Sequence, residues 1–457
     1  MNDEINHWEI EVRNRQHYVS TNPELAHSSA YFNLSTFEKG IGISNIADNR
    51  ITAYWPLDFS DYCIEEHLSD GRIARLDNHT GSSAADGDFI VLQVISAAGT
   101  PAIINWLKQG LAVESSEVGY ASSKEPGLIT SQFFSLPARV AQQLASLPAP
   151  TGFSAIIAET SYSAEAISPA KLKGNTHTLL LRTQEAFEND LLGLKAEILA
   201  KYGALNYFPP KRFGRRHNSH LLGKLVLSEN FEEAIKDFLC QTSPTEELLL
   251  TRLREVALSG FPNFEKLDKI FSVLPVTFSH ELAVIRYLHD HPADYAGAII
   301  QIKHLAKQWL FAYGAYIFNT NLGEASGIKG IINEQLPWTF SPDTADKLVY
   351  RRCFERDNIF NGFEVNFIKE LIPERKQLIP GRIFPKALTC RAVGKGVALS
   401  FFLEGTMPAE TVVANLLNFT SVTPRPDWVD VSRFDAKKML DQGSVADIAL
   451  RLSPQNA

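Results

Sequence analysis

NYFPPKRFG, residues 206–214, marks the point at which the pattern of the chain changes. Ahead of this segment, DFIVLQVI (88–95) is dense in β-branched residues and THTLLLR (176–182) has the composition of a strand. Behind it, segments such as IKHLAKQWLFAYGAYIF (302–318) repeat apolar residues at helical spacing. Strand-like segments, ALTCRAV (387–393) and VALSFFLE (397–404), return near the end. This order predicts an α+β protein in which a sheet domain is interrupted by an inserted, helix-rich domain.

The same pattern divides the chain into four stretches. Residues 1–50 show no long periodicity, and we take them as an N-terminal extension without a recognisable role. Residues 51–205 and 383–457 are predicted to form the two parts of the sheet domain, and residues 206–382 the insertion. At 457 residues the chain is long enough for two domains with cores of their own.

Two helices of the first part are predicted from the residues at their ends. Thr100 and Pro101 follow the first strand, and we expect a helix there with the Thr100 hydroxyl as its cap and Pro101 in its first turn. A longer helix is expected over residues 184–202, ended by Gly203. Its apolar stripe is predicted from four residues at helical spacing: Phe187, Leu191, Leu194 and Ile198.

Composition indicates a globular protein of a reducing compartment. Hydrophobic residues make up 45% and charged residues 21%, which argues against a disordered or fibrous chain. The four cysteines are far apart and form no CxxC pair, so we expect neither a zinc knuckle nor a disulfide framework, and a cytoplasmic location. The polar N-terminus does not resemble a signal peptide, and the most apolar helical stretch (297–318) contains Lys303 and Lys307, so no membrane association is predicted.

Several classes of site have no support in the sequence. There is no GxxxxGK[ST], GxGxxG or GxSxG segment, which gives nucleotide-binding and hydrolase interpretations no basis. His280, Glu281, His289 and His291 lack the HExxH spacing of a metal site and are interpreted as polar helix ends. We therefore predict no metal and no cofactor.

One short stretch favours a nucleic-acid partner even though the net charge is −8. Cations and aromatic rings alternate between residues 207 and 216, where the cations can contact phosphates while the rings stack on bases. A solvated basic loop is the alternative. The predicted RNA-binding residues are Tyr207, Phe208, Lys211, Arg212, Phe213, Arg215 and Arg216.

NYFPPKRFG resembles the NYFGxQRFG signature of the TruD family of tRNA pseudouridine synthases. Further segments resemble other motifs of that family, in the order that the family has them. These segments are LDFSDYCIEE (57–66), GYASSKEPGLITSQFFSLP (119–137), GNTHTLLLR (174–182), AYGAYIFNTNL (312–322) and LSFFLEGTMPAETVV (399–413). Together they span about residues 57–413 and leave the first fifty or so outside.

The resemblance implies a pseudouridine synthase core with a mixed or antiparallel sheet, built from the segments on both sides of an inserted TRUD domain. It also implies isomerisation of uridine to pseudouridine in RNA, with tRNA as the RNA expected, without cofactor or metal. The RNA would lie between the two domains of a monomeric protein.

That reaction breaks an N-glycosidic bond, turns the base over and forms a carbon–carbon bond to the same sugar, and family members use one Asp carboxylate for it. The family's Lys-Asp pair corresponds to Lys124 and Glu125, where Glu places the carboxylate about 1.5 Å further along the side chain. Asn175, His177 and Phe401 fall at positions of the family's uridine pocket, where His177 replaces the aromatic residue of the family's GNxF segment. Two hypotheses follow. The first is an active synthase, and the second is a catalytically impaired TruD-like protein that binds RNA or acts as an RNA chaperone. A protein–protein scaffold is a third.

Overall fold

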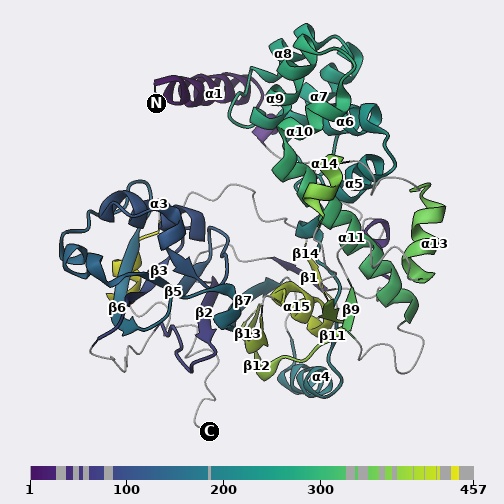
Figure 1. Ribbon diagram of the computed structural model, residues 1–457. Coiled ribbons are helices and arrows are strands. Elements are labelled where there is room, and N and C mark those ends of the chain that lie inside the picture. Colours follow the sequence, from purple (N-terminus) through teal and green to yellow (C-terminus); the bar gives the residue numbers. More distant parts are fainter. Residues whose placement is uncertain are drawn as a thin grey trace. The chain divides into compact units, whose positions relative to one another are not determined.

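The computed structural model describes residues 2–26, 38–44, 51–54, 61–76, 86–183, 187–325, 335–337, 348–359, 366–372, 378–394, 396–405, 407–417, 419–421 and 434–441. The chain divides into two compact units (Figure 1). The helical unit comprises Met1–Ile46 and Leu205–Arg382, and the sheet unit comprises Ala47–Ala204 and Ile383–Ala457. The first residues therefore belong with the helical unit, while the sheet unit is assembled from segments on both sides of the insertion.

The described residues of the sheet unit form a ten-stranded mixed sheet, which confirms the predicted α+β class. Its main path runs β12-β13-β7-β2-β5-β3-β6, with β1 beside β7 and β14, and β4 beside β5. Among the pairs formed by the described strands of this sheet, β2–β5 and β1–β14 are parallel and the others antiparallel. The strands are β1 (Ile51–Tyr54), β2 (Tyr62–Leu68), β3 (Phe89–Ser96), β4 (Gly119–Tyr120), β5 (Ile129–Pro137), β6 (Ala155–Ser163), β7 (Leu172–Thr183), β12 (Lys386–Ala392), β13 (Gly396–Glu404) and β14 (Phe419–Ser421).

Antiparallel pairing of β13 with β7 unites the two sequence halves of this sheet. Nine residue pairs, from Gly396 opposite Arg182 to Glu404 opposite Gly174, connect strands that lie on either side of the helical insertion. At Gly174 an added Cβ would lie 2.0 Å from the Leu403 carbonyl oxygen, so only glycine allows this approach. The strands predicted near the C-terminus are therefore inner and edge members of the main sheet.

Helix α3 (Thr100–Leu111) begins where the sequence predicts a helix, but not with the predicted cap. It buries Ile103, Leu107 and Leu111 against β3 and β5. Gly99 is the N-cap residue and no side chain caps this end, so the predicted capping role of Thr100 is wrong. Thr100 is instead the first helical residue, and its hydroxyl bonds to groups outside the helix.

Helix α4 (Asn189–Tyr202) ends at Gly203 as predicted, but buries a different stripe. Its core residues are Leu192, Ala196 and Leu199, in a cluster that includes α15 (Ala409–Leu417) and β13. The predicted stripe is wrong in three of its four positions, because Leu191, Leu194 and Ile198 are 49%, 54% and 50% exposed, while Phe187 packs against the cluster. Apolar residues occupy two faces of this helix, and spacing alone does not say which face meets the sheet.

The helical unit packs around Trp309 and Tyr313 of α11, the longest of its described helices. Close contact between α5 and α11 depends on Gly223, where a Cβ would lie 2.2 Å from the Trp309 carbonyl oxygen. Within the described residues, no helix combines the length and apolar character needed to cross a bilayer. The helices are α1 (Asn2–Thr21), α5 (Ser219–Leu227), α6 (Phe231–Cys240), α7 (Leu248–Gly260), α8 (Phe264–Phe271), α9 (Ser279–Asp290), α10 (Tyr295–Gln301), α11 (Lys303–Ala325), α13 (Leu348–Arg356) and α14 (Asn366–Leu371).

Helix α1 is joined to the rest of the helical unit through polar side chains. The Glu11 carboxylate is 4% exposed and accepts hydrogen bonds from the backbone N–H groups of Val276 (2.8 Å) and Thr277 (2.9 Å). Arg15 donates to Glu247 (2.5 Å) and to the Thr277 hydroxyl (3.0 Å). A helix attached in this way needs no apolar stripe, which explains why the sequence pattern of residues 1–50 gives no sign of it.

We expect Glu11→Ala to lower the free energy of unfolding by about 1–3 kcal/mol, because two partly buried backbone amides lose their acceptor. Glu9→Ala is the matched control, since Glu9 is exposed on the same helix and should change stability by less than about 0.5 kcal/mol. Equilibrium urea unfolding of both variants measures the difference. Equal effects would show that α1 is not anchored through Glu11.

Candidate active site

The loop between β4 and β5, residues 121–128, carries the predicted catalytic pair with its two side chains in different surroundings. Lys124 is buried, at 7% exposure, whereas Glu125 and Pro126 are exposed. Gly127, which follows, adopts φ +82°, a conformation that favours glycine. The loop therefore turns a cation into the sheet unit and leaves the adjacent carboxylate at the surface.

The Lys124 ammonium group is fully used by protein acceptors. It donates to Glu66 Oε1 (3.2 Å), to Asn175 Oδ1 (2.7 Å) and to the Ser122 hydroxyl. An ammonium group has three N–H donors, so none remains for a substrate in this arrangement. Burial lowers the pKa of Lys124, and the neighbouring Glu66 carboxylate opposes that shift. Lys124 was predicted to be catalytic. Its contacts in the structure are those of a residue that holds the loop in place.

Glu66, at the buried centre of this cluster, was not among the site residues predicted from the sequence. It is 0% exposed on β2, and its Oε1 accepts from Ser122 (2.9 Å) as well as from Lys124. Its Oε2 accepts the backbone N–H of Phe133 on β5 (3.1 Å). The sequence could have indicated Glu66, because it is a carboxylate at an inward-facing position of the segment LDFSDYCIEE (57–66). Residues 57–60 of that segment lie outside the described part of the chain.

Sheet register brings the predicted pocket residues together on one face. Asn175 lies opposite Glu66 on β2, and His177 lies opposite Phe401 on β13. Because Asn175 and His177 are two residues apart on β7, their side chains project to the same side. The Asn175 amide group donates to the Gly405 carbonyl (3.3 Å), so both of its ends bond to protein.

His177 and Phe401 are buried and stack on each other, with ring centroids 5.6 Å apart and an interplanar angle of 29°. His177 Nδ1 also lies 3.0 Å from the Tyr62 hydroxyl. Lys124 and Asn175 therefore adjoin Glu66, His177 and Phe401 lie two residues further along the same face of the sheet, and Glu125 is exposed on the adjoining loop.

We expect Glu66→Gln to lower the free energy of unfolding by about 3–5 kcal/mol at neutral pH, because it leaves a buried ammonium without its counter-ion. Replacing both partners, as in Glu66→Gln with Lys124→Met, should cost less than the sum of the single changes. Urea unfolding of the four proteins in this cycle gives the coupling energy. Additive costs would contradict a buried pair.

The stability of the Glu66→Gln variant should depend on pH differently from that of the unchanged protein. Because the Lys124 pKa is lowered in the folded state from 10.5, the unfolded chain binds more protons just below that pH, and stability rises with pH there. Removing Glu66 removes the contribution that raises this pKa, so below pH 10.5 the stability of Glu66→Gln should rise more steeply with pH than that of the unchanged protein. Parallel pH profiles would contradict this assignment.

The predicted RNA-binding stretch lies in the helical unit and contains both exposed and buried side chains. Arg216 is an interior residue, with its side chain 7% exposed and its guanidinium donating to the carbonyls of Asp237 (3.2 Å), Phe238 (2.8 Å) and Gln241 (2.8 Å). Burial, with nearby Arg254, lowers the pKa of Arg216 to about 10. The Arg216 side chain is therefore part of the buried framework of the helical unit, and its guanidinium does not have the exposure that the predicted phosphate contact requires.

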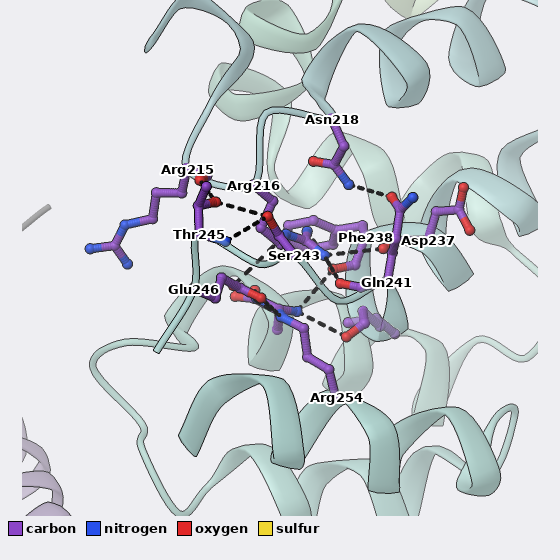
Figure 2. Close-up of polar contacts among 12 residues, drawn as sticks. Arg215, Arg216, Asn218, Asp237, Phe238, Gln241, Ser243, Thr245, Glu246 and Arg254 are labelled. Atoms are coloured by element: carbon purple, nitrogen blue, oxygen red, sulfur yellow. Dashed lines mark hydrogen bonds and ion pairs between the residues drawn. The ribbon is translucent and has the colours of Figure 1, made fainter. Parts of the chain in front are cut away.

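The other members of this stretch differ in exposure. Phe213 is 0% exposed and belongs to the core, and Arg212 lies over the Phe208 ring at 5.3 Å. Phe208 in turn packs edge-on against Phe318, and the Tyr207 hydroxyl donates to the Ser44 carbonyl (3.2 Å). Lys211 and Arg215 are exposed. In Figure 2 the Arg215 side chain points away from the network that holds Arg216 and Arg254.

A metal centre has no candidate ligand set in the part of the chain that the structure describes. No group of three or more His, Cys, Asp or Glu side chains is placed to hold an ion there. His280 Nε2 and His304 Nε2 lie 2.8 Å apart, which is a hydrogen-bond distance between two rings on α9 and α11.

Comparison with known proteins matches this fold and these motifs to one family. The model of the TruD family, tRNA pseudouridine synthase D, matches residues 58–344, more than half of the chain. The chain therefore belongs to the TruD family.

Individual relatives carry names of the same kind. A probable tRNA pseudouridine synthase D of Methanosarcina barkeri is 26% identical over 51% of this chain and 53% of its own length. A probable tRNA pseudouridine synthase D of Thermococcus gammatolerans is 24% identical over 63% of this chain and 67% of its own length. The tRNA pseudouridine synthase D of Aquifex aeolicus is 22% identical over 45% of this chain and 51% of its own length. The chain thus spans about half the length of the Methanosarcina and Aquifex relatives.

A solved structure shows the same fold. The chain superposes on a protein assigned as tRNA pseudouridine synthase D from Methanosarcina mazei with a TM-score of 0.62 and 18% identity. The superposition covers 85% of this chain and 98% of the other.

Proposed function

We propose that this protein isomerises uridine to pseudouridine in tRNA, with the Glu125 carboxylate acting on the sugar or the base. The observation that carries the proposal is the geometry of the 121–128 loop, in which Lys124 is held inside by three acceptors while Glu125 is exposed beside it. The names of the family and of its relatives support tRNA as the substrate.

The reaction requires a carboxylate at contact distance from the uridine, whether it serves as a nucleophile or as a base. An exposed, ionisable side chain on a fixed loop can meet a nucleotide that has been turned out of its stack. Asn175, His177 and Phe401 enter the proposal as support for the loop. The Asn175 side chain accepts from the Lys124 ammonium and donates to the Gly405 carbonyl, and the rings of His177 and Phe401 stack on each other. The four cysteines all lie in the described part of the chain and form no disulfide there, which supports the proposal of a reducing, cytoplasmic location.

We expect Glu125→Gln to lower product formation by about 100-fold or more, because the amide can serve neither as a base nor as a nucleophile. Glu125→Asp keeps the carboxylate at the length that the family uses and should retain product formation. The measurement is pseudouridine mapping by mass spectrometry after incubation of each purified protein with unmodified tRNA transcripts.

The matched control is Glu165→Gln, which neutralises a side chain that is 76% exposed in the same unit and should leave product formation unchanged. Product from Glu125→Gln at the unchanged rate would refute the role of this carboxylate. No product from the unchanged protein, together with salt-dependent tRNA binding, would favour the RNA-binding hypothesis.

For the RNA contact we propose Lys211 and Arg215, the exposed cations of the 207–216 stretch. Exposed cations bind phosphates by displacing counter-ions, so affinity falls as salt rises. The partly buried rings of Tyr207 and Phe208 belong to the same stretch and support the conformation from which these cations project.

We expect Lys211→Ala with Arg215→Ala to weaken tRNA binding and to reduce the slope of log K against log salt by about 0.7–0.9 for each lost cation. Filter binding over a range of salt concentrations measures the slope. The matched control is Arg252→Ala with Lys269→Ala, two cations of the helical unit whose side chains are 70% and 73% exposed. Equal slopes for the two double variants would place the RNA contact elsewhere.

A further inference from the structure

The junction between β3 and α3 forms hydrogen bonds with the backbone of the 121–128 loop. The Thr100 N–H donates to the Lys124 carbonyl (3.0 Å), and the Lys124 N–H donates to the Thr100 hydroxyl oxygen (2.8 Å). Beyond Glu125, the Gly127 N–H donates to the Ala97 carbonyl (2.7 Å). Residues 97–100 thus bond to the loop on both sides of Glu125, independently of the Lys124 side chain.

The Thr100 hydroxyl is itself oriented by Gln132 on β5. It donates to Gln132 Oε1 (2.9 Å), so its proton is used and a lone pair is directed to the Lys124 N–H. The Gln132 amide then donates to the Ser122 carbonyl, which adds a further tie to the same loop. One hydroxyl and one amide therefore fix the backbone at residues 122 and 124.

Neither side chain can reach a substrate. Thr100 is 1% exposed and Gln132 is 0% exposed. The loop also lies directly against the junction, because a Cβ at Gly99 would be 3.1 Å from both the Lys124 carbonyl oxygen and Pro126 Cδ. Since Ile103, Leu107 and Leu111 anchor α3 in the core, the contact transmits the rigidity of the core to the loop.

We propose that Thr100 is a positioning residue for the reaction, which holds the backbone of Glu125 at the distance that the carboxylate needs. This inference rests on the proposed function of Glu125. Glu has one more rotatable bond than Asp, so a fixed backbone removes one source of positional error at this site. A displacement of about 1 Å in a reacting group can lower a rate by about 100-fold.

The test is Thr100→Val, which preserves the shape of the side chain and removes its hydroxyl. With tRNA as substrate we expect kcat to fall by about 10- to 100-fold while KM stays within about two-fold, since the RNA contacts are unchanged. Thr100→Ser restores the hydroxyl and should restore most of kcat. The matched control is Thr178→Val, which removes a hydroxyl that lies 3.2 Å from the Ser400 hydroxyl on the same sheet and should leave kcat unchanged.

Hydrogen exchange of the loop gives a readout that does not depend on activity. Peptides covering residues 121–128 should exchange faster in Thr100→Val than in the unchanged protein or in Thr178→Val, because the Lys124 amide loses its acceptor. If Thr100→Val does not fold, Gln132→Met takes its place, since it removes the group that orients the hydroxyl and should produce the same two changes.

The outcomes separate this inference from the proposed function. If the unchanged protein forms pseudouridine and Thr100→Val matches Thr178→Val in both kcat and exchange, the positioning role is wrong and the proposed function stands. A rise in KM at constant kcat would equally overturn it, because Thr100 would then support RNA binding. If the unchanged protein forms no pseudouridine, the proposed function fails and a catalytic positioning role fails with it, whatever the exchange rates.

Discussion

The arrangement of the sheet unit around its candidate site depends on the buried contact between Lys124 and Glu66. An ammonium group in this environment is costly unless acceptors surround it, and Glu66, Ser122 and Asn175 supply one acceptor for each N–H. A loop conformation that withdrew Lys124 from this cluster would leave a buried carboxylate unpaired. The contact therefore selects one loop conformation, and in that conformation Glu125 is exposed.

Arginines of the helical unit follow the same constraint. Arg254, 4% exposed, is surrounded by Glu246, Glu281 and the carbonyls of α6, and Arg216 lies beside it with three carbonyl acceptors. Buried guanidinium groups need several acceptors, and a helix end offers unpaired carbonyls. A cluster of cations in a sequence therefore contains two kinds of residue, those that build the framework and those that remain at the surface. Only the structure distinguishes Arg216 from Arg215.

Much of the fold could be predicted because it depends on local patterns. The β-branched run of β3, the strand of β7 and the returning strands β12 and β13 are visible as composition, and their order implies an interrupted sheet. Helix α1 could not be predicted because Glu11 and Arg15 attach it through partners more than 230 residues away. For the same reason Thr100 looks like a helix cap in sequence, while its partners Lys124 and Gln132 come from other segments. Glu66 and Asn175 become neighbours only through strand register.

Glu125, at the position where the resemblance to the family implies Asp, follows a backbone that is held on both sides. The Lys124 side chain anchors the loop, the Thr100 hydroxyl accepts the main-chain N–H of Lys124, and neither contact involves the side chain at 125. Compared with Asp, Glu at this position extends the carboxylate by one carbon–carbon bond, roughly 1.5 Å. The contacts that hold the loop backbone do not depend on this difference. A longer reach from an unchanged anchor is compatible with catalysis when the uridine sits correspondingly further from the loop. Under the proposed function, the decisive quantity is thus the depth at which the uridine is held beside the loop.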